Sequence, residues 1–475
     1  MLNFQDIAQI TVEAIHENKE DVGIIDHSSK KKPKTEEELR KEKVKEHVSD
    51  LIDNSSLHGL SYIFDKRHPI RRVIWFFITT SAFIYSMLKV YESTEYYLSY
   101  PFTTARMRQY VDSIEFPAVS FCNINDMRIS ILNGTNVDIA ILTNNPGNVT
   151  AEEYRSTTRS AAHDITEMLV DCNFNGMKCT AKNFTEFFWK QGDRCFTFNS
   201  GKQGPVLKVT GTGVERSLTL TINLQHFDYY RDSMVSGIHM ILHGQDETPV
   251  KIRGPMISPG YTSFIKVEKK KILNLKSPYK TNCGELDLKY FNGYSMHTCW
   301  LEKLTDYVVK HCNCKDFFMP GNHSICDLGT AYTCMWPKWE EYDKNKLANC
   351  PLPCEIDSFH SETISRALFP SEQYAHKLKK ILEKEPHMKN VVIKNVKQFM
   401  RDNLLRVVIY YDDMSYERVE QQPSYDTLEW LGDVGGQIGL FIGAGAMSYF
   451  EFVDCIALVI YARFFQSFKP APPNV

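Results

Sequence analysis

The sequence lacks a large excess of either charge, has few long hydrophobic runs, and contains no cysteine in residues 1–121. Of its 475 residues, 43% are hydrophobic, and the net charge is −3 at pH 7. Because the mean hydropathy is also negative, this composition excludes a polytopic membrane protein and provides no basic face for nucleic acid. Motifs of the HExxH, GxSxG and P-loop types are missing, so we predict that the chain is not an enzyme and uses no cofactor.

Cysteine is concentrated in one part of the chain. Of the 13 cysteines, all but Cys455 lie between Cys122 and Cys354. An even, clustered set indicates an oxidising compartment and a disulfide framework. Zinc is the alternative, with Cys312 and Cys314 as candidate ligands. The spacings do not form paired CxxC knuckles, so we expect no structural metal.

Residues 73–90 carry no charge before Lys89 and can span a bilayer. Basic residues precede this segment and tyrosines follow it: Lys66, Arg67, Arg71 and Arg72 before, and Tyr96, Tyr97 and Tyr100 after. Because positive charge favours the cytoplasmic side, we expect a cytoplasmic N-terminus. A buried core helix is the alternative, but it does not account for the one-sided basic flank.

A second apolar segment, from about residue 430 to residue 468, contains many glycines and several carboxylates. Ionisable residues inside a membrane face a bundle interior or a water path, and small residues allow close helix approach or a break in the helix. We therefore predict that this segment lines a pore. The alternative is an anchor helix that dimerises through its small residues, which would not require Asp433.

Two spans place both termini on one side of the plasma membrane. We expect five regions: 1–70 cytoplasmic, 71–95 the first transmembrane helix, 96–425 extracellular, 426–465 the second transmembrane helix with the pore, and 466–475 a cytoplasmic tail. Four glycosylation sequons fall in the extracellular range, at Asn133, Asn148, Asn183 and Asn322. The predicted fold class is α+β, with two transmembrane helices and a large disulfide-rich extracellular domain.

Local patterns give a coarse view of secondary structure. β-Branched or alternating residues predict strands at 111–121, within 204–224, at 235–243 and at 404–411. Helical periodicity predicts helices at 150–170, 299–311, 337–347 and 371–384. The charged run 30–47 is expected to be a mobile or helical arm, with binding to anionic lipid as the alternative.

Five motifs, in order along the chain, resemble the degenerin/epithelial sodium channel family, which includes acid-sensing and peptide-gated channels. They are Leu57-His58-Gly59-Leu60, Phe116-Pro117-Ala118-Val119 with Cys122-Asn123, His311-Cys312-Asn313-Cys314 with Met319-Pro320-Gly321, Pro351-Leu352-Pro353-Cys354, and the string from Gly432 to Ala444. The resemblance implies a homotrimer or heterotrimer around a central pore, blocked by amiloride and passing sodium. Each subunit would have palm, finger, thumb, knuckle and β-ball elements.

The resemblance also implies a disulfide map. The implied pairs are Cys122–Cys195, Cys172–Cys179, Cys283–Cys354, Cys299–Cys350, Cys312–Cys334 and Cys314–Cys326. Acid-sensing relatives have one more bridge, whose two positions are Lys303 and Ala348 here. The loss of both partners keeps the number of paired cysteines even.

The family's selectivity filter corresponds to Gly443, Ala444 and Gly445. Gly445 stands where the family has serine, so we expect relaxed sodium selectivity with some calcium passage. A cytoplasmic segment around His58 and Gly59 is expected to re-enter and meet the filter. An ordinary surface histidine is the alternative for His58.

The pore and gate residues implied by the resemblance are Gly432, Asp433, Gly436, Glu451 and Asp454. Asp433 would form an outer carboxylate ring that concentrates cations and holds divalent blockers. For Glu451 and Asp454 the alternative is hydrogen bonding between helices. Gating would be coupled to the extracellular domain through Tyr100 and Tyr279, with ordinary interfacial tyrosines as the alternative.

The residues that follow Tyr100 bear on the activating stimulus. Acid-sensing relatives carry a histidine pair where this chain has Pro101 and Phe102. Because histidine is the side chain that titrates near neutrality, we favour an extracellular peptide over protons, mechanical load or constitutive opening. Three rival functions are a purinergic-type channel, a non-conducting receptor or adhesion subunit, and a membrane-anchored ectoenzyme.

Overall fold

The computed structural model describes residues 35–465 apart from 148, 190–192, 231–233, 246, 248–253 and 389–390. The chain divides into two units, one made of residues 1–101 and 423–475 and the other of residues 102–422. The predicted tail 466–475, the start of the charged run and the sequon at Asn148 lie outside the described residues.

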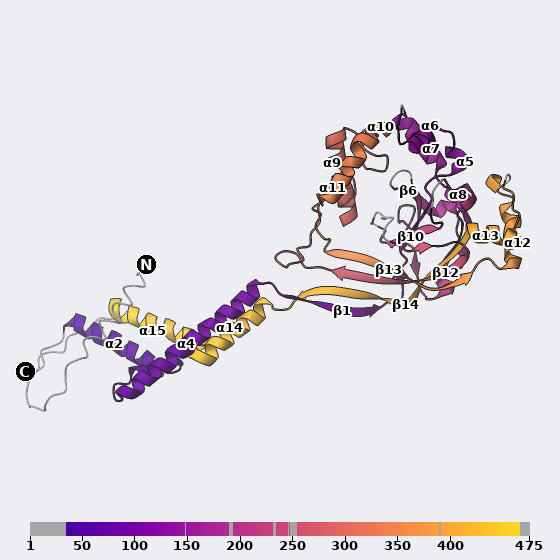
Figure 1. Cartoon of the computed structure of the whole chain (residues 1–475). Helices are drawn as coiled ribbons and strands as arrows, with labels where there is room; N and C mark the ends of the chain where they lie inside the picture. The colour runs from indigo at the N-terminus through magenta and orange to yellow at the C-terminus, as the bar shows by residue number, and fades with distance from the viewer. Residues whose placement is uncertain are drawn as a thin grey trace, which may run out of the picture. The chain divides into compact units, whose positions relative to one another are not determined.

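The first unit is helical. Its helices are α2 (Glu36–Asn54), α3 (Leu60–Phe64), α4 (Pro69–Leu98), α14 (Thr427–Ile442) and α15 (Ala446–Phe464). Two of them begin with a capping box, in which Thr35 and Glu38 start α2, and Asp426 and Glu429 start α14. Figure 1 shows α4 and α14 side by side, while α15 follows α14 in a different direction and lies along α2.

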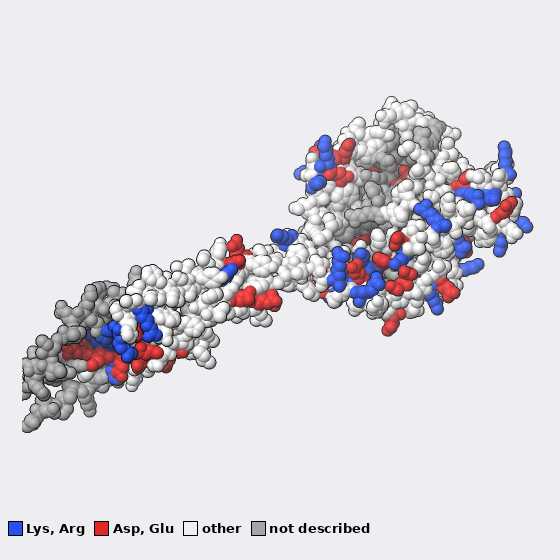
Figure 2. Space-filling model, turned by 60° about the horizontal axis from the view of Figure 1, so that its bottom comes forward, with Lys and Arg blue, Asp and Glu red and all other residues white. Residues whose placement is uncertain are grey.

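Within the described residues, α4 is the one helix long and apolar enough to cross a membrane alone. Only 6% of its most apolar stretch is buried, so its side chains face outward as they would towards lipid. Helices α14 and α15 meet the same criterion only as a bent pair. Figure 2 shows charged side chains gathered in two places on this unit, with an uncharged stretch between them.

Aromatic and polar contacts hold α14 against α4. The ring of Trp430 stacks on Tyr97 with 5.3 Å between centroids, and its Nε1 donates to Oγ1 of Thr94 at 3.2 Å. About two helical turns further along α14, Nε2 of Gln437 donates to Oγ of Ser93 at 2.9 Å. These polar contacts between helices suit an apolar environment, where water does not compete for the donors.

The second unit contains two main sheets. Their strands, together with the short pair β2–β8, are β1 (Phe102–Tyr110), β2 (Ile114–Glu115), β3 (Ala118–Asn123), β4 (Leu169–Phe174), β5 (Met177–Lys178), β6 (Phe184–Phe188), β7 (Arg194–Phe198), β8 (Lys208–Val209), β9 (Leu218–Asn223), β10 (Ile238–His243), β11 (Met256–Ile257), β12 (Tyr261–Leu273), β13 (Glu355–Leu368) and β14 (Leu404–Pro423). The seven-stranded sheet has the order β13-β12-β14-β9-β4-β5, with β1 also paired to β14. Its β12–β14 pair is parallel, whereas β12–β13, β14–β9, β9–β4 and β4–β5 are antiparallel. The five-stranded sheet has the order β11-β10-β3-β7-β6.

Helices cluster around these sheets. They are α5 (Ile129–Leu132), α6 (Asn136–Thr143), α7 (Ala151–Ala161), α8 (Ile165–Met168), α9 (Met296–Cys312), α10 (Leu328–Thr330), α11 (Trp336–Lys344), α12 (Glu372–Leu382) and α13 (Val396–Asn403), with a π-turn at Ala331–Met335. The largest core joins the two sheets and includes Phe116, Phe121, Leu218 and Ile222. A separate core packs α9 against the π-turn and α11, with Leu304 and Trp339 among its members.

Six disulfides lie in the second unit. They join Cys122–Cys195, Cys172–Cys179, Cys283–Cys354, Cys299–Cys350, Cys312–Cys334 and Cys314–Cys326, the same pairs that the resemblance implies. Cys455 is a free thiol in α15. At the two positions where acid-sensing relatives have a further bridge, Nζ of Lys303 instead donates to the Asn349 carbonyl at 2.8 Å, next to Ala348.

The predicted helices and strands are found with shifted ends, and two are interrupted. The strand predicted at 111–121 is interrupted at Phe116-Pro117, since proline has no N–H for a ladder. The helix predicted at 150–170 ends as α7, resumes as α8 and then gives way to β4. The described part of the charged run 30–47 is helical and belongs to α2. The long strands β12 and β13 were not predicted.

Candidate functional site

The second apolar segment is broken where the filter was predicted. Helix α14 ends at Ile442, α15 begins at Ala446, and the two helices are bent by 68°. Gly443 caps α14 in the left-handed region with φ 77°, and Gly445 is extended with φ −103°. A helix break in an apolar segment leaves carbonyl groups without intrahelical partners, which is tolerated where they line a cavity or bind ions.

Gly443 is the more tightly enclosed of the two glycines at the break. A Cβ atom placed there would lie 2.7 Å from the Ser56 carbonyl oxygen and 2.8 Å from Cδ2 of His58. The left-handed φ excludes most other residues as well. By contrast, a Cβ at Gly445 would meet nothing within 4 Å. The structure therefore requires glycine at position 443, whereas position 445 has room for a side chain.

The loop that contains His58 and Gly59 meets the break directly. The backbone N–H of His58 donates to the carbonyl of Ile442, the last residue of α14, at 2.8 Å. Gly59 has φ 86°, and a Cβ there would lie 2.5 Å from Oγ1 of Thr79 on α4. The loop thus passes between α4 and the end of α14, and only glycine fits at its closest approach to α4.

Sequence reasoning missed the serines that fasten this loop. Oγ of Ser56 lies 2.5 Å from Oγ of Ser448, which in turn donates to the Gly443 carbonyl at 3.3 Å and accepts from the Gly445 N–H at 3.1 Å. The backbone N–H of Ser56 donates to Oε2 of Glu451 at 3.1 Å. Glu451, predicted to be a pore residue with hydrogen bonding between helices as the alternative, is half-buried and here bonds to the loop that follows α2, so its pore role stays a prediction.

The outer half of α14 presents an open face. A Cβ placed at Gly432, Gly435, Gly436 or Gly439 would meet nothing within 4 Å. Asp433 is exposed, and its Oδ2 accepts a hydrogen bond from the Tyr425 hydroxyl at 2.6 Å. Such a small-residue face allows another helix to approach closely. Within the described residues no group of three or more His, Cys, Asp or Glu side chains could hold a metal ion.

Of the remaining predicted residues, Ala444 lies within the break, between the two glycines. Asp454 is exposed on α15. Tyr100 follows α4 with φ 49° in the first unit, whereas Tyr279 lies in a turn of the second unit, where its N–H donates to the Lys276 carbonyl at 3.1 Å. Their coupling stays a prediction. The side chains at Asn133, Asn183 and Asn322 are exposed, as glycosylation requires.

Asp316, His163 and His243 are among the buried titratable groups of the second unit. Asp316 is 2% exposed, its Oδ1 accepts from the Phe317 N–H at 2.7 Å, and its Oδ2 has no partner among the described residues. Burial raises the pKa of this carboxyl to about 6. Burial lowers the pKa of His163 and of His243 to about 4, so both rings are neutral at physiological pH.

Comparison with known proteins supports the motif-based resemblance. A family model described as "Amiloride-sensitive sodium channel" matches residues 51–455. Acid-sensing ion channel 1C of Danio rerio is 29% identical over 86% of this chain and 83% of that channel. Acid-sensing ion channel 1 of Gallus gallus is 29% identical over 88% and 84% of the two chains. The bile acid-sensitive ion channel of Rattus norvegicus is 28% identical over 87% and 88%.

These matches confirm the resemblance to the degenerin/epithelial sodium channel family and the expectation that the chain is not an enzyme. Among solved structures, a proton-activated chloride channel aligns over 82% of this chain and 96% of that chain. The alignment has a TM-score of 0.32 and 9% sequence identity, a likeness too weak to bear on function.

Proposed function

This chain belongs to the amiloride-sensitive sodium channel family, and we propose that it forms a trimeric channel that passes sodium through the break between α14 and α15. The observation that carries this proposal is the docking of the His58 loop against Ile442 and Gly443. Backbone carbonyls at the break replace water around a cation, and the loop fixes their direction from the inner side.

In a threefold assembly, the open glycine face of α14 turns towards the axis. Because Gly432 and Gly436 have no neighbour within 4 Å of an added Cβ, equivalent helices approach closely there. Asp433 then forms an outer ring of three carboxylates, which attracts cations and binds divalent blockers. Asp454 contributes charge to the inner mouth, and Glu451 holds the His58 loop in place.

We assign α4 as the first membrane span and the bent pair α14–α15 as the second, with both termini cytoplasmic. The second unit is then extracellular, which suits its six disulfides and its exposed sequons. In family terms, the seven-stranded sheet is the palm and the five-stranded sheet the β-ball. Helices α5 to α8 form the finger, α9 to α11 the thumb, and α12 with α13 the knuckle.

Opening is assigned to an extracellular peptide. The chain has Pro101 and Phe102 where acid-sensing relatives have histidines, so that pair cannot sense acid here. A second candidate stimulus is acid, because Asp316 is buried with a pKa raised to about 6 and the compared channels include acid-sensing ones. In either case, Tyr100 and Tyr279 transmit the change to the membrane helices.

Expression of the full chain in oocytes tests the proposal. We expect an amiloride-blocked sodium current that appears with a peptide panel and has relaxed selectivity against potassium and calcium. Low pH and ATP serve as comparison stimuli in the same cells. A chain that reaches the surface but never conducts would instead support a non-conducting receptor subunit, and an ATP-evoked current would support a purinergic-type channel.

A further inference from the structure

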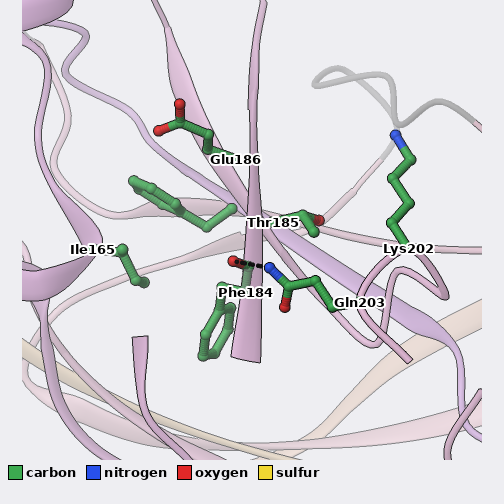
Figure 3. Close-up of a pocket in the computed structure, with 7 residues that line it drawn as sticks. Ile165, Phe184, Thr185, Glu186, Lys202 and Gln203 are labelled. Carbon is green, nitrogen blue, oxygen red and sulfur yellow. Dashed lines mark hydrogen bonds between the residues drawn. The ribbon is translucent and has the colours of Figure 1, made fainter. Parts of the chain in front are cut away.

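A cavity of about 450 Å³ lies in the second unit against β6, at the edge of the five-stranded sheet. Consecutive residues Phe184, Thr185 and Glu186 form its wall, so the cavity runs along the edge of the strand (Figure 3). This volume falls in the range of about 300–1,000 Å³ that is typical of ligand sites.

The outer edge of β6 has unused backbone groups beside this cavity. At the end of the β6–β7 hairpin, the Trp189 N–H donates to the Asp193 carbonyl at 2.9 Å. Bonded pairs in an antiparallel ladder recur at every second residue, so Phe187 and Thr185 bond to β7 while Glu186 faces away from it. The register therefore directs the Glu186 N–H and C=O away from β7, and among the described residues no turn, loop or cap bond reaches either group.

A side chain already occupies the neighbouring outward carbonyl. Nε2 of Gln203 donates to the Phe184 carbonyl at 3.2 Å, which Figure 3 shows as a dashed line. This contact demonstrates that the edge carbonyls of β6 accept hydrogen bonds from outside the sheet. An incoming amide of similar chemistry would find the Glu186 carbonyl two residues further along the same edge.

The floor of the cavity is apolar and its rim carries uncompensated positive charge. Ile165, Phe184 and Phe196 are buried and define the floor. The Glu186 carboxylate is neutralised by Arg159 at 2.7 Å and Arg194 at 2.5 Å.

Lys202 extends from the opposite side of the rim (Figure 3). It has no acidic partner among the described residues. An anionic group entering the cavity would therefore meet an ammonium group that no described carboxylate compensates.

We propose that this cavity binds an extended peptide, which adds a strand to β6 through the Glu186 backbone and places a carboxylate beside Lys202. The inference rests on the peptide opening proposed above and names its site. A strand-adding peptide gains main-chain hydrogen bonds from the edge and specificity from a side-chain cavity. A compact small molecule would fill the floor but leave the edge N–H and C=O of Glu186 unused.

The test uses the full chain in oocytes and a library of acetylated pentapeptides, prepared as matched pools with C-terminal acid or amide ends. Lys202→Glu tests the rim charge, and Lys178→Glu on exposed β5 is the control with the same charge change. We expect Lys202→Glu to raise the half-maximal concentration of acidic peptides about tenfold, with little change for neutral amides. Lys178→Glu should leave both responses unchanged.

A second pair of variants isolates the backbone contact. Glu186→Pro and Glu186→Ala both remove the carboxylate, but only proline also removes the outward N–H, at a position where an edge strand tolerates it. We expect Glu186→Pro to weaken the peptide response about three- to tenfold more than Glu186→Ala, the effect of one hydrogen bond. Asn183→Gln is included because a glycan there would lie beside the cavity.

Each outcome is decisive. Unchanged responses in Lys202→Glu and equal responses in the two Glu186 variants, with the wild type still peptide-gated, would overturn this site but leave the proposed function standing. A wild type that conducts sodium but ignores every pool would overturn peptide opening and the site together. A response found only in Asn183→Gln would show that sugar occupies the cavity in the native chain, which also overturns the proposal.

Discussion

Gly443→Ala is expected to detach the His58 loop from the end of α14. The new methyl group would lie 2.7 Å from the Ser56 carbonyl oxygen and 2.8 Å from the His58 ring. Both distances are far shorter than ordinary van der Waals contacts, and the first involves backbone that cannot rotate away. The φ of 77° at this residue adds strain for any L-residue with a side chain.

The cost can be estimated from these two effects. The left-handed conformation costs alanine roughly 1–2 kcal/mol, and overpacking by one methyl group costs roughly 1–3 kcal/mol. Together they amount to about 2–5 kcal/mol, which lowers the equilibrium constant between the docked and the detached loop at least about 30-fold. Gly445→Ala is the matched control, because its Cβ meets nothing within 4 Å and its φ is −103°.

Two readouts separate a detached loop from a misfolded chain. Surface biotinylation should find both variants at the membrane, since the change lies far along the sequence from the disulfide-rich unit. The amiloride-sensitive current should fall at least about tenfold in Gly443→Ala and stay near the wild-type level in Gly445→Ala. Equal currents and equal ion selectivity in the two variants would refute the reasoning about the docked loop.

Three further predictions concern selectivity, gating and pH. Gly445→Ser has room for its side chain, so this variant should express normally and should have a higher sodium-to-potassium permeability ratio than wild type. An unchanged ratio in bi-ionic reversal potentials would remove the argument about the missing hydroxyl. Gly432→Cys, once modified by a bulky thiol reagent, should give a standing current, whereas a silent variant at the surface would count against a gate at this position. Folding raises the pKa of Asp316 to about 6, so ionising this buried carboxyl lowers the free energy of unfolding by about 3 kcal/mol. The stability that the protonated carboxyl provides is therefore full below about pH 4 and is lost as pH rises through 6. Buried His163 and His243, with pKa values lowered to about 4, act in the opposite direction because acid must charge them. The purified full chain of Asp316→Asn should therefore unfold at a higher temperature than wild type at pH 8, with the difference shrinking at pH 4.5, and a difference independent of pH would contradict this assignment.

The break in the second apolar segment was foreseeable from the sequence, but its fastening was not. Glycines at 443 and 445 predicted that the backbone would leave helical geometry, because only small residues accept such a conformation. The meeting of His58 with the break came from family resemblance, since nothing local links segments so far apart. Glu451 was a candidate pore residue, but nothing in the sequence indicated its bond to Ser56, because the two residues are 395 positions apart and serines are common at helix ends.

The missed strands β12 and β13 show where pattern reasoning failed in the second unit. β12 contains the run Lys269-Lys270-Lys271, which reads as a solvated loop rather than a strand. In the sheet these lysines pair with carboxylates on the strands either side, with Lys269 2.7 Å from Asp357 and Lys270 2.9 Å from Glu417. Cross-strand ion pairs of this kind stabilise a strand, but they can be predicted only once its neighbouring strands are known.

The central claim is that the glycine-rich face of α14 and the break beyond it meet water inside a threefold bundle. Cysteine substitution of each residue from 432 to 454, followed by modification with a membrane-impermeant thiol reagent, tests this most directly. We predict that Gly432→Cys, Asp433→Cys and Gly436→Cys react and change the current in at least one gating state, while lipid-facing sites such as Leu440→Cys do not. If every position were sealed from the aqueous reagent in all gating states, the pore assignment would be wrong.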